Sequence, residues 1–182
     1  FIKSPMFFDL PVIPFEKIEE THPPYEYKMF VAVGYKNLNR LRTKFYDSAK
    51  EKGYELISYI SSKAFIWRNV EIGDNCFIFE DNTLQPFVKI SNNVIMWSGN
   101  HIGHHSKIGD NCFISSHVVL SGFCELEDNC FLGVNSTISH RVKIGKDCLI
   151  GMGAVITKNT KPGKVYVGNP AKDINRKSID LL

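Results

Sequence analysis

The sequence has little of what marks a membrane protein or a nucleic-acid-binding protein. No apolar run approaches the roughly 20 residues that cross a bilayer, and no signal peptide is visible at its start. Charge of one sign is also scarce, because 22 Lys and Arg against 19 Asp and Glu leave a net charge of +3, with the basic residues scattered. We therefore expect a cytoplasmic protein whose partners include neither a membrane nor a nucleic acid.

Cysteine is present but not in a form that suggests disulfides. All five cysteines fall in the same small position of a repeat described below, where reduced thiols pack as small apolar side chains. This placement leaves no cysteine for a disulfide framework or a zinc cluster, and we expect no metal cofactor.

What is present is a repeat with a period of six that runs from Val70 to Ile156. The third position of every block is aliphatic, and the first position is usually small. Two inward positions separated by one outward position describe a short strand. Neither a helical period of 3.6 nor a simple strand period of 2 accounts for a period of six, whereas short strands joined by tight corners do.

A longer period, three blocks in length, lies over the shorter one. The segment Ile72-Gly-Asp-Asn-Cys76 has counterparts that begin at Ile90, Ile108, Leu126 and Ile144. Gly, Asp and Asn tolerate positive φ and cap tight turns with their own side chains. Three strands therefore make one triangular coil, and the stacked coils form a parallel β-helix, so the fold class is mainly β. The period alone does not give the hand, since most parallel crossovers are right-handed.

The rest of the chain does not follow the repeat. The pattern before it predicts a strand over 28–33, a basic amphipathic helix over 37–53 with Asn37 as N-cap, and a strand over 54–60. A shorter strand over 11–15 and a turn of helix over 16–20 come earlier. Strand, helix and strand together indicate a partial Rossmann-like α/β unit.

These patterns divide the chain into three parts. We expect the partial Rossmann-like domain over 1–63, the β-helix over 64–160, and an exit loop with a short helix from residue 173 over 161–182. The chain opens on Phe1 rather than Met, in the middle of an alternating βα pattern. We therefore expect the α/β unit to be incomplete, with its beginning missing.

Histidines gather near the middle of the repeat. Stacking by three blocks places His104, Gly122 and His140 in one slot of one corner, with neighbours about 4.7–4.9 Å apart. His117 belongs to another corner, in line with Gly99. An imidazole titrates near neutral pH and can take a proton from an attacking amine or hydroxyl, while a glycine amide can stabilise an oxyanion. The arrangement suits acyl transfer, and the alternative is an exposed corner histidine without a chemical role.

Several motifs carry a resemblance to a known family. Asn100-His-Ile-Gly-His-His-Ser-Lys-Ile-Gly109 with Gly122, the closing Val167-Gly-Asn-Pro-Ala-Lys172 and the upstream Val31-Ala-Val-Gly-Tyr35 resemble the hexapeptide-repeat nucleotide-sugar acetyltransferases. Within this family the chain is most similar to the group of sialic-acid O-acetyltransferases and bacillosamine N-acetyltransferases. Within that group it most resembles the enzymes that N-acetylate 4-amino-4,6-dideoxy nucleotide sugars. The resemblance implies a left-handed β-helix, acetyl-CoA as acyl donor, a nucleotide-sugar substrate for surface glycans such as O-antigen, and a homotrimer with acetyl-CoA between adjacent β-helices.

Carried over residue by residue, the resemblance gives His104 as the catalytic base and the Gly122 amide as the oxyanion donor. Two positions depart from the family's pattern. The acidic residue that usually follows the base is here His105, which makes His105 a rival base, and an asparagine that commonly helps to hold the sugar is here Trp97. The glycine-rich first βα turn that the family uses for the nucleotide is absent.

The candidate site residues fall into three groups. The catalytic group is His104, His105 and Gly122; the cofactor-binding group is Gly122, Gly151, Gly153, Ala154, Lys158 and Lys161; the substrate-binding group is Gly34, Tyr35, Trp97 and Asn100. The glycines of the second group leave room for the pantetheine arm and the lysines meet its phosphates, although the same glycines could serve only as tight corners and the lysines as a solvated loop. Outward apolar residues are expected to be buried by three-fold association: Phe77, Ile95, Phe113 and Phe131.

Three other functions stay open. A sugar O-acetyltransferase would use the same fold but needs stronger base assistance. A γ-type carbonic anhydrase would need three zinc histidines at a spacing that resembles x, x+36 and x+41; His104 and His140 fit the first interval, but the third position is Gly145, which cannot bind zinc. A non-catalytic β-helix scaffold is the remaining alternative.

Overall fold

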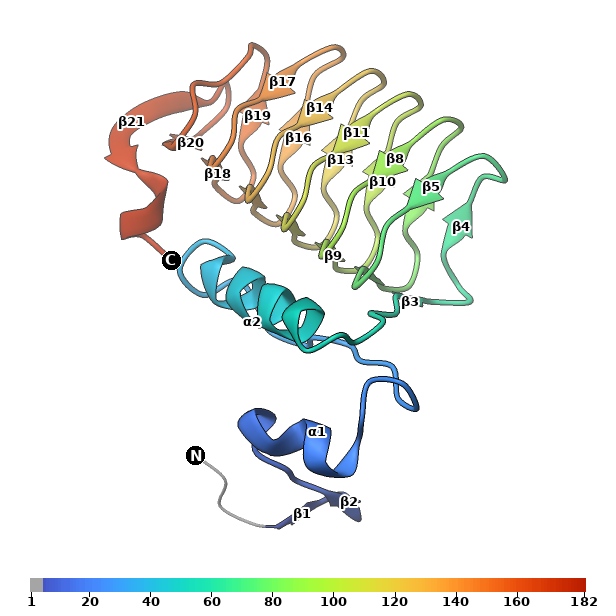
Figure 1. The fold of residues 1–182 in the computed structure, drawn as a ribbon. Coiled ribbons are helices and arrows are strands. Elements are labelled where there is room, and N and C mark those ends of the chain that lie inside the picture. The colour runs from blue at the N-terminus through green and yellow to red at the C-terminus, as the bar shows by residue number, and fades with distance from the viewer. Residues whose placement is uncertain (1–4) are drawn as a thin grey trace.

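The structure is a computed structural model that describes residues 5–182 of the 182-residue chain. Phe1, on which the expectation of a missing beginning rests, lies outside the described residues. From Tyr59 onward the chain winds into a left-handed parallel β-helix of triangular coils (Figure 1). The fold class expected from the repeat and from the resemblance is therefore confirmed.

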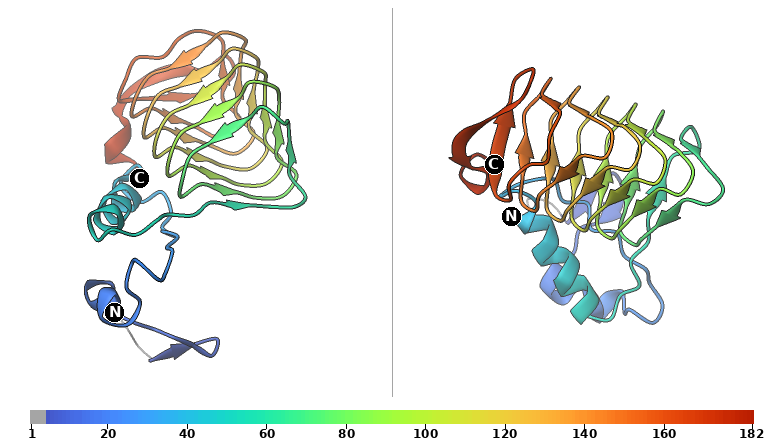
Figure 2. Two further views of the ribbon diagram at one scale, coloured as in Figure 1. Left: turned by 45° about the vertical axis from the view of Figure 1, so that its right-hand side comes forward. Right: turned by 90° about the horizontal axis from the view of Figure 1, so that it is seen from above.

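Each coil contributes one short strand to each of three faces, which Figure 2 shows stacked along a common axis. Face 1 consists of β3 (Tyr59–Ile60), β6 (Phe77–Ile78), β9 (Ile95–Met96), β12 (Phe113–Ile114), β15 (Phe131–Leu132), β18 (Leu149–Ile150), β20 (Lys164–Val167) and β21 (Lys172–Lys177). Face 2 consists of β4 (Phe65–Ile66), β7 (Thr83–Leu84), β10 (His101–Ile102), β13 (Val119–Leu120), β16 (Thr137–Ile138) and β19 (Val155–Ile156). Face 3 consists of β5 (Glu71–Ile72), β8 (Lys89–Ile90), β11 (Lys107–Ile108), β14 (Glu125–Leu126) and β17 (Lys143–Ile144).

The register of the strands repeats once per coil of three blocks, as the sequence indicated. On face 2, for example, Ile102 pairs in parallel with Leu120, and Leu120 with Ile138. The aliphatic third positions and the small first positions fill the interior of the coils, and nearly all of them are fully buried. All five cysteines are free and buried there. Each buried Leu or Ile contributes roughly 1.5–3 kcal/mol, so this column of side chains is the main source of stability.

Three edges join the faces, and at each the second turn residue takes positive φ. The 1–2 edge carries turn residues 80–81, 98–99, 116–117, 134–135 and 152–153; the 2–3 edge carries 86–87, 104–105, 122–123 and 140–141; the 3–1 edge carries 74–75, 92–93, 110–111, 128–129 and 146–147. At the 3–1 edge these positive-φ residues are mostly asparagines, whose side chains tolerate the left-handed region. Asn75, Asn93 and Asn111 form a ladder in which each Nδ2 donates to the next Oδ1 at 2.8 and 2.7 Å.

The segment before the β-helix is held against the 3–1 edge by helix α2 (Arg40–Glu51). Arg42 is fully buried, and its guanidinium donates to the backbone oxygens of Gly34, Asn93, Asn111 and Cys112. Burial lowers the pKa of Arg42 to about 10, which leaves it charged at neutral pH. The carbonyl oxygens therefore satisfy the buried charge, and the helix is fixed to successive coils.

Asn39 extends the same attachment to the next coil. Its Nδ2 donates to the backbone oxygens of Asn129 and Cys130 at 3.3 and 3.2 Å, and Arg40 forms an ion pair with Asp147 at 2.5 Å. At the other end of the segment, Val31 N–H donates to Asn75 Oδ1 at 2.7 Å. The N-terminal segment is therefore tied to the 3–1 edge along most of the solenoid.

The N-terminal part is more reduced than expected. The strand expected over 28–33 is present only as a parallel bridge between Met29 and Leu56, and the residues expected at the end of the next strand form β3 of the β-helix. Helix α2 begins at Arg40 because Asn39, not Asn37, is its N-cap. The small elements before it are β1 (Met6–Phe7), β2 (Leu10–Pro11), a 3-10 turn (Phe15–Lys17) and α1 (Ile18–Thr21).

The prediction of a C-terminal helix from residue 173 is mostly wrong. Residues Lys172–Lys177 form β21, which pairs antiparallel with β20 at the end of face 1, and only Ser178–Asp180 turn into a 3-10 helix. Backbone pairing with the last coil thus overrides the local pattern. None of the described helices is long and apolar enough to cross a bilayer.

The expected reason for three-fold association is also wrong. Ile95 and Phe113 on face 1 are 9% and 5% exposed within one chain, because the N-terminal segment covers them. Tyr35 packs edge-on against Phe113 and Phe131, with ring centroids 5.0 and 5.1 Å apart. The chain's own N-terminal segment therefore buries Ile95 and Phe113 and partly covers Phe77 and Phe131, so their burial does not require a second copy.

Candidate active site

His104 and Gly122 meet at the 2–3 edge, as the stacking of the coils indicated. Strand β10 carries His104 two positions beyond its end, and β13 carries Gly122 to the same slot one coil further on. A Cβ atom on Gly122 would lie 2.7 Å from His104 Nε2. The imidazole thus lies directly over Gly122, and the missing side chain of the glycine provides the space for the ring.

The backbone N–H of Gly122 has no hydrogen-bond acceptor among residues 5–182. The equivalent N–H of Asp110 at the 3–1 edge donates to Asp128 Oδ1 of the next coil at 3.0 Å. At the 2–3 edge the next coil offers His140 instead. Gly122 is buried, so an unpaired donor there is costly and an oxyanion would satisfy it.

His105 lies beside His104 in a stack of aromatic rings. Its Nδ1 is 3.1 Å from His104 Nδ1. Its ring lies between Phe87 and Phe123 of the neighbouring coils, with centroids 4.6 and 4.7 Å away and interplanar angles of 28° and 12°. The positive φ of the second turn position, 60° at His105, points these three side chains outward in one column.

The same edge continues with polar and basic residues. His140 lies one coil beyond Gly122, with its ring centroid 6.5 Å from that of His104. Arg141 lies over the Phe123 ring at 5.5 Å. Lys158 follows His140 by one coil at the corner after β19 and is exposed. The 2–3 edge thus presents two histidines, an unpaired N–H and then cations along one line.

The other residues expected to bind the cofactor lie elsewhere. Gly153 is exposed at the 1–2 edge with φ of 64° and open space beside it. Gly151 is covered by β20, because a Cβ atom there would lie 2.8 Å from Val167 Cγ1. Ala154 is fully buried inside the coil, so its side chain cannot line a groove and that assignment is wrong. Lys161 is exposed in the loop between β19 and β20, where the coil is shortened and Asn159 and Thr160 are the residues that bond to Lys143.

Two residues expected to bind substrate, Gly34 and Trp97, do come together. They line a pocket of about 230 Å³ on face 1 whose other walls are apolar. Tyr35 is next to this pocket, 44% exposed, against Phe113. The pocket lies beside the 1–2 edge, so within one chain it is separated from His104 by face 2.

Asn100 does not belong to this group. It is 1% exposed, and its Nδ2 donates to Asn82 Oδ1 at 2.9 Å and to the backbone oxygen of Trp97. Its Oδ1 accepts from Val118 N–H at 2.8 Å. The side chain is used inside the coil, so its expected contact with a substrate is wrong.

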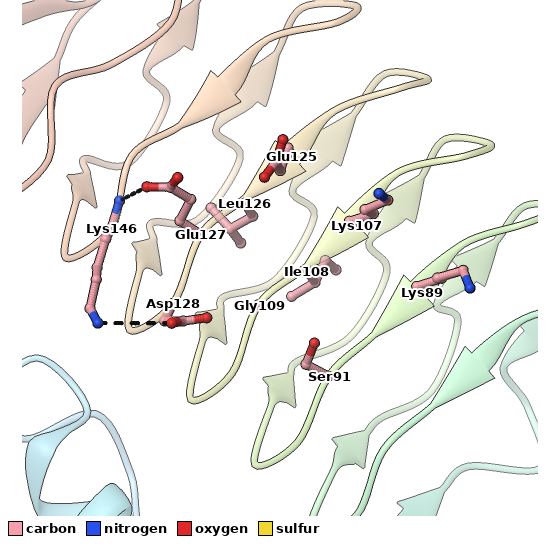
Figure 3. Close-up of a pocket in the computed structure, with 10 residues that line it drawn as sticks. All are labelled: Lys89, Ser91, Lys107, Ile108, Gly109, Glu125, Leu126, Glu127, Asp128 and Lys146. Carbon is pink, nitrogen blue, oxygen red and sulfur yellow. Dashed lines mark hydrogen bonds and ion pairs between the residues drawn. The ribbon is translucent and has the colours of Figure 1, made fainter.

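A shallow pocket of about 480 Å³ lies on face 3, and none of the histidines lines it (Figure 3). Its lining includes both basic and acidic side chains, and the neighbouring Lys143 pairs with Glu125 and Glu127 at 3.2 and 2.6 Å. These hydrogen bonds lower the pKa of Glu127. Exposed pairs of this kind contribute little to stability and keep the face hydrated.

The residues that could bind a metal are not clustered. Within the described part of the chain no three His, Cys, Asp or Glu side chains form a group that could hold an ion. Position 145, where the third histidine of a γ-type carbonic anhydrase would lie, is a glycine packed against Pro162.

Comparison with known proteins places this architecture in a class. The family model described as bacterial transferase hexapeptide (six repeats) matches residues 87–122, and that of the hexapeptide repeat of succinyl-transferase matches 125–158. The β-helix of this chain is therefore built on hexapeptide repeats of the kind described by these two transferase models. No curated protein matched the chain.

Solved structures share the fold over 72–95% of the chain. PerB from Caulobacter crescentus, in complex with CoA and GDP-perosamine, is 24% identical with a TM-score of 0.86, covering 93% of this chain and 81% of that one. The acetyltransferase domain of PglB from Neisseria gonorrhoeae, in complex with acetyl coenzyme A, is 22% identical with a TM-score of 0.87, covering 95% and 83%. A mutant of AntD, an N-acyltransferase from Bacillus cereus, in complex with dTDP and Coenzyme A, is 21% identical with a TM-score of 0.61, covering 72% and 89%.

Four residues that shape the edge were not among the predicted site residues. Phe87 and Phe123 stack on His105, and Gln85 Oε1 accepts from His104 N–H at 3.0 Å. A Cβ atom on Gly103 would lie 2.6 Å from the Gly122 nitrogen, so a glycine there keeps that space free. Stacking by whole coils would have found the two phenylalanines, since both lie in the column of His105.

Proposed function

We propose that this protein is an acetyl-CoA-dependent N-acetyltransferase that transfers acetyl to the amino group of a nucleotide-linked amino-deoxy sugar. The observation that carries the proposal is the position of His104 Nε2 over Gly122, whose N–H is unpaired within the described residues. Similarity to proteins solved with CoA and GDP-perosamine, with acetyl coenzyme A, and with dTDP and Coenzyme A supports the choice of donor and acceptor. In this proposal the product enters surface-glycan synthesis, such as that of O-antigen, and the enzyme is cytoplasmic.

The chemistry follows from the edge. The sugar amine attacks the thioester carbonyl carbon, and His104 Nε2 takes the proton that the nitrogen loses. The Gly122 N–H donates to the oxyanion of the tetrahedral intermediate, a contact whose removal costs roughly 2.7–4 kcal/mol in other enzymes. The C–S bond then breaks, the carbonyl re-forms, and the CoA thiolate leaves and is protonated, which restores neutral His104.

For the donor we propose a path along the 2–3 edge. Gly122 lies next to the acetyl group, and Lys158, two coils beyond at the same corner, approaches the phosphates. Lys161 on the adjoining loop offers a second charge. Gly153 at the 1–2 edge joins this groove only if another copy brings its own 1–2 edge alongside.

We also propose a homotrimer, because another copy would bring its 1–2 edge alongside this groove. Face 3 is charged and face 1 is covered by the N-terminal segment, whereas the outward residues of face 2 are uncharged and reach the surface: Phe65, Thr83, His101, Val119, Thr137 and Val155. Association through face 2 would bring the Gly34 and Trp97 pocket of one copy toward the His104 edge of another. The acceptor sugar would then bind between copies.

The test is a transfer assay with a matched variant. The protein is incubated with acetyl-CoA and a panel of amino and hydroxyl nucleotide sugars while free thiol is measured, and the product is identified by mass. We expect release only with an amino sugar, and His104→Ala should lower kcat by roughly 10²–10⁴-fold with acetyl-CoA affinity within twofold. Release with a hydroxyl sugar instead would make it an O-acetyltransferase, and calorimetry without acetyl-CoA binding would favour a scaffold.

A further inference from the structure

The role of the residue beside the proposed base is open, because a histidine stands at position 105 where an acid would pair with the imidazolium. We propose that His105 is the positioning residue of the site, which accepts a hydrogen bond from His104 through its Nδ1 and shares the proton taken from the substrate. This inference rests on the proposed function. Its observation is the 3.1 Å distance between the two Nδ1 atoms.

The distance restricts where the hydrogen atoms are. At 3.1 Å one Nδ1 must donate and the other must accept. Once His104 has taken a proton, both of its nitrogens carry hydrogen, so His105 Nδ1 can only be the acceptor. The neutral resting state that leads to it without rearrangement has Nδ1–H on His104, an unprotonated His104 Nε2 over Gly122, and Nε2–H on His105.

The rings around His105 hold it in that orientation. Phe87 and Phe123 stack on its two faces at 4.6 and 4.7 Å, and these contacts favour the ring orientation in which its Nδ1 faces His104. Because a ring face attracts a cation, the same stack stabilises positive charge on His105. A proton can therefore pass from His104 Nδ1 to His105 Nδ1, which leaves the charge between two aromatic faces instead of beside a carboxylate.

The other charged and titratable groups that contact the pair within the described chain are cationic or basic. His140 lies with its ring centroid 6.5 Å from that of His104, and Arg141 lies at 5.5 Å over the Phe123 ring. Gln85, whose Oε1 accepts from His104 N–H, is neutral. None of these neighbours is an anion, so no carboxylate of residues 5–182 pairs with the imidazolium at this edge.

Two substitutions separate this role from packing. His105→Phe keeps a ring in the stack but removes the acceptor, and we expect kcat to fall about tenfold to a hundredfold, as when partners that orient a histidine are lost elsewhere, with KM for acetyl-CoA unchanged. His105→Glu restores an acceptor, should recover most of the rate, and should move the acidic limb of the kcat/KM profile upward by about one pH unit. A purely structural residue would leave His105→Phe near wild type and the acidic limb unmoved in His105→Glu, and that result would overturn the inference.

Long-range ¹⁵N–¹H NMR of the unliganded protein gives a readout without catalysis. His104→Gln and His105→Phe assign the signals, and we expect the Nδ1–H tautomer for His104 and the Nε2–H tautomer for His105. The reverse pair of tautomers would refute the inference while leaving acetyl transfer intact. Expected tautomers in a protein that acetylates no sugar would instead support the pair and refute the proposed function.

Discussion

Adding one methyl group to Gly122 should stop turnover while leaving the fold intact. The Cβ atom of Gly122→Ala would lie 2.7 Å from His104 Nε2 and 2.9 Å from its Cε1, well inside the roughly 3.5–4.0 Å of an unstrained contact. The imidazole must therefore move by roughly 1 Å, away from the Gly122 N–H that is proposed to bind the oxyanion. Displacements of this size cost about 10²-fold in rate, and loss of the oxyanion geometry raises this to about 10³-fold.

Stability should change little, because the clash involves the end of a side chain. The φ of Gly122 is not in the left-handed region, so alanine is tolerated there and gains roughly 0.4–1 kcal/mol by restricting the unfolded chain. That gain offsets the displacement of one partly exposed ring. We expect the melting temperature to stay within about 4 °C of wild type, since 1 kcal/mol corresponds to about 2–4 °C in a protein of this size.

Gly99→Ala is the matched control on another edge. Its Cβ atom would lie 2.5 Å from His117 Nδ1, but Gly99 has φ of 73°, where a side chain costs roughly 1–2 kcal/mol. This variant should lose stability and keep kcat within about threefold. Single-turnover transfer and thermal unfolding are measured for both proteins. Full activity in Gly122→Ala, or equal loss of activity in the two variants, would refute the assignment of the 2–3 edge.

Three further predictions concern the fold and the assembly. Arg42→Met should destabilise the protein by about 3–5 kcal/mol in urea unfolding, because several carbonyl oxygens lose their buried donor, whereas Arg40→Ala, which breaks one exposed ion pair, should cost less than about 1 kcal/mol; equal effects would contradict the attachment described above. Burial raises the pKa of the Cys76 thiol from 9.0 to about 11, so the unfolded chain ionises first and stability present below pH 9 is lost between pH 9 and 11; Cys76→Ala should remove this part of the loss, and an unchanged slope would contradict it. Val119→Glu on face 2 should split the trimer in sedimentation velocity, Lys107→Glu on face 3 should not, and a trimer that survives the first change would exclude face 2 as the interface.

The β-helix could be predicted because its sequence is locally redundant. Every coil repeats the same inward positions and the same corner chemistry, so a single unusual residue such as Asn82 does not shift the register. The column of His104 and Gly122 followed from arithmetic alone, since parallel strands stack in register once per coil. The hand could not be obtained in this way and came from the resemblance.

The parts that failed depend on contacts between distant segments. Nothing in the local pattern of Arg42 distinguishes it from the exposed basic residues of its helix. Yet Arg42 is the basic residue that is buried against the 3–1 edge and donates to its carbonyl oxygens. Face 1 was assigned to association because Phe113 points outward from the coil, and only the path of the N-terminal segment shows that Tyr35 covers it. Ala154 and Asn100, predicted to bind cofactor and substrate, occupy first positions of their blocks, and these positions lie inside the coil.

Cofactor and acceptor residues were the least predictable. Small residues near the end of the repeat were grouped by their closeness in sequence, but Gly153 and Lys158 lie on different edges of the triangle. Closeness along a coil means little in this fold, because a single block of the repeat carries the chain from one edge to the next. Closeness along the axis, at a separation of one whole coil, is what brings side chains together.

Because helix α2 is bound to successive coils, the N-terminal segment fits only one number of coils along this stretch. Arg42 and Asn39 together bind carbonyl oxygens of three successive coils, at Asn93, at Asn111 with Cys112, and at Asn129 with Cys130. A duplication or loss of one coil between these points would preserve every face and every edge of the solenoid, yet it would displace the bound carbonyls along the axis and detach the helix. Growth of the solenoid by whole coils is therefore open only beyond this stretch, and the axial distance from the helix to His104 cannot drift.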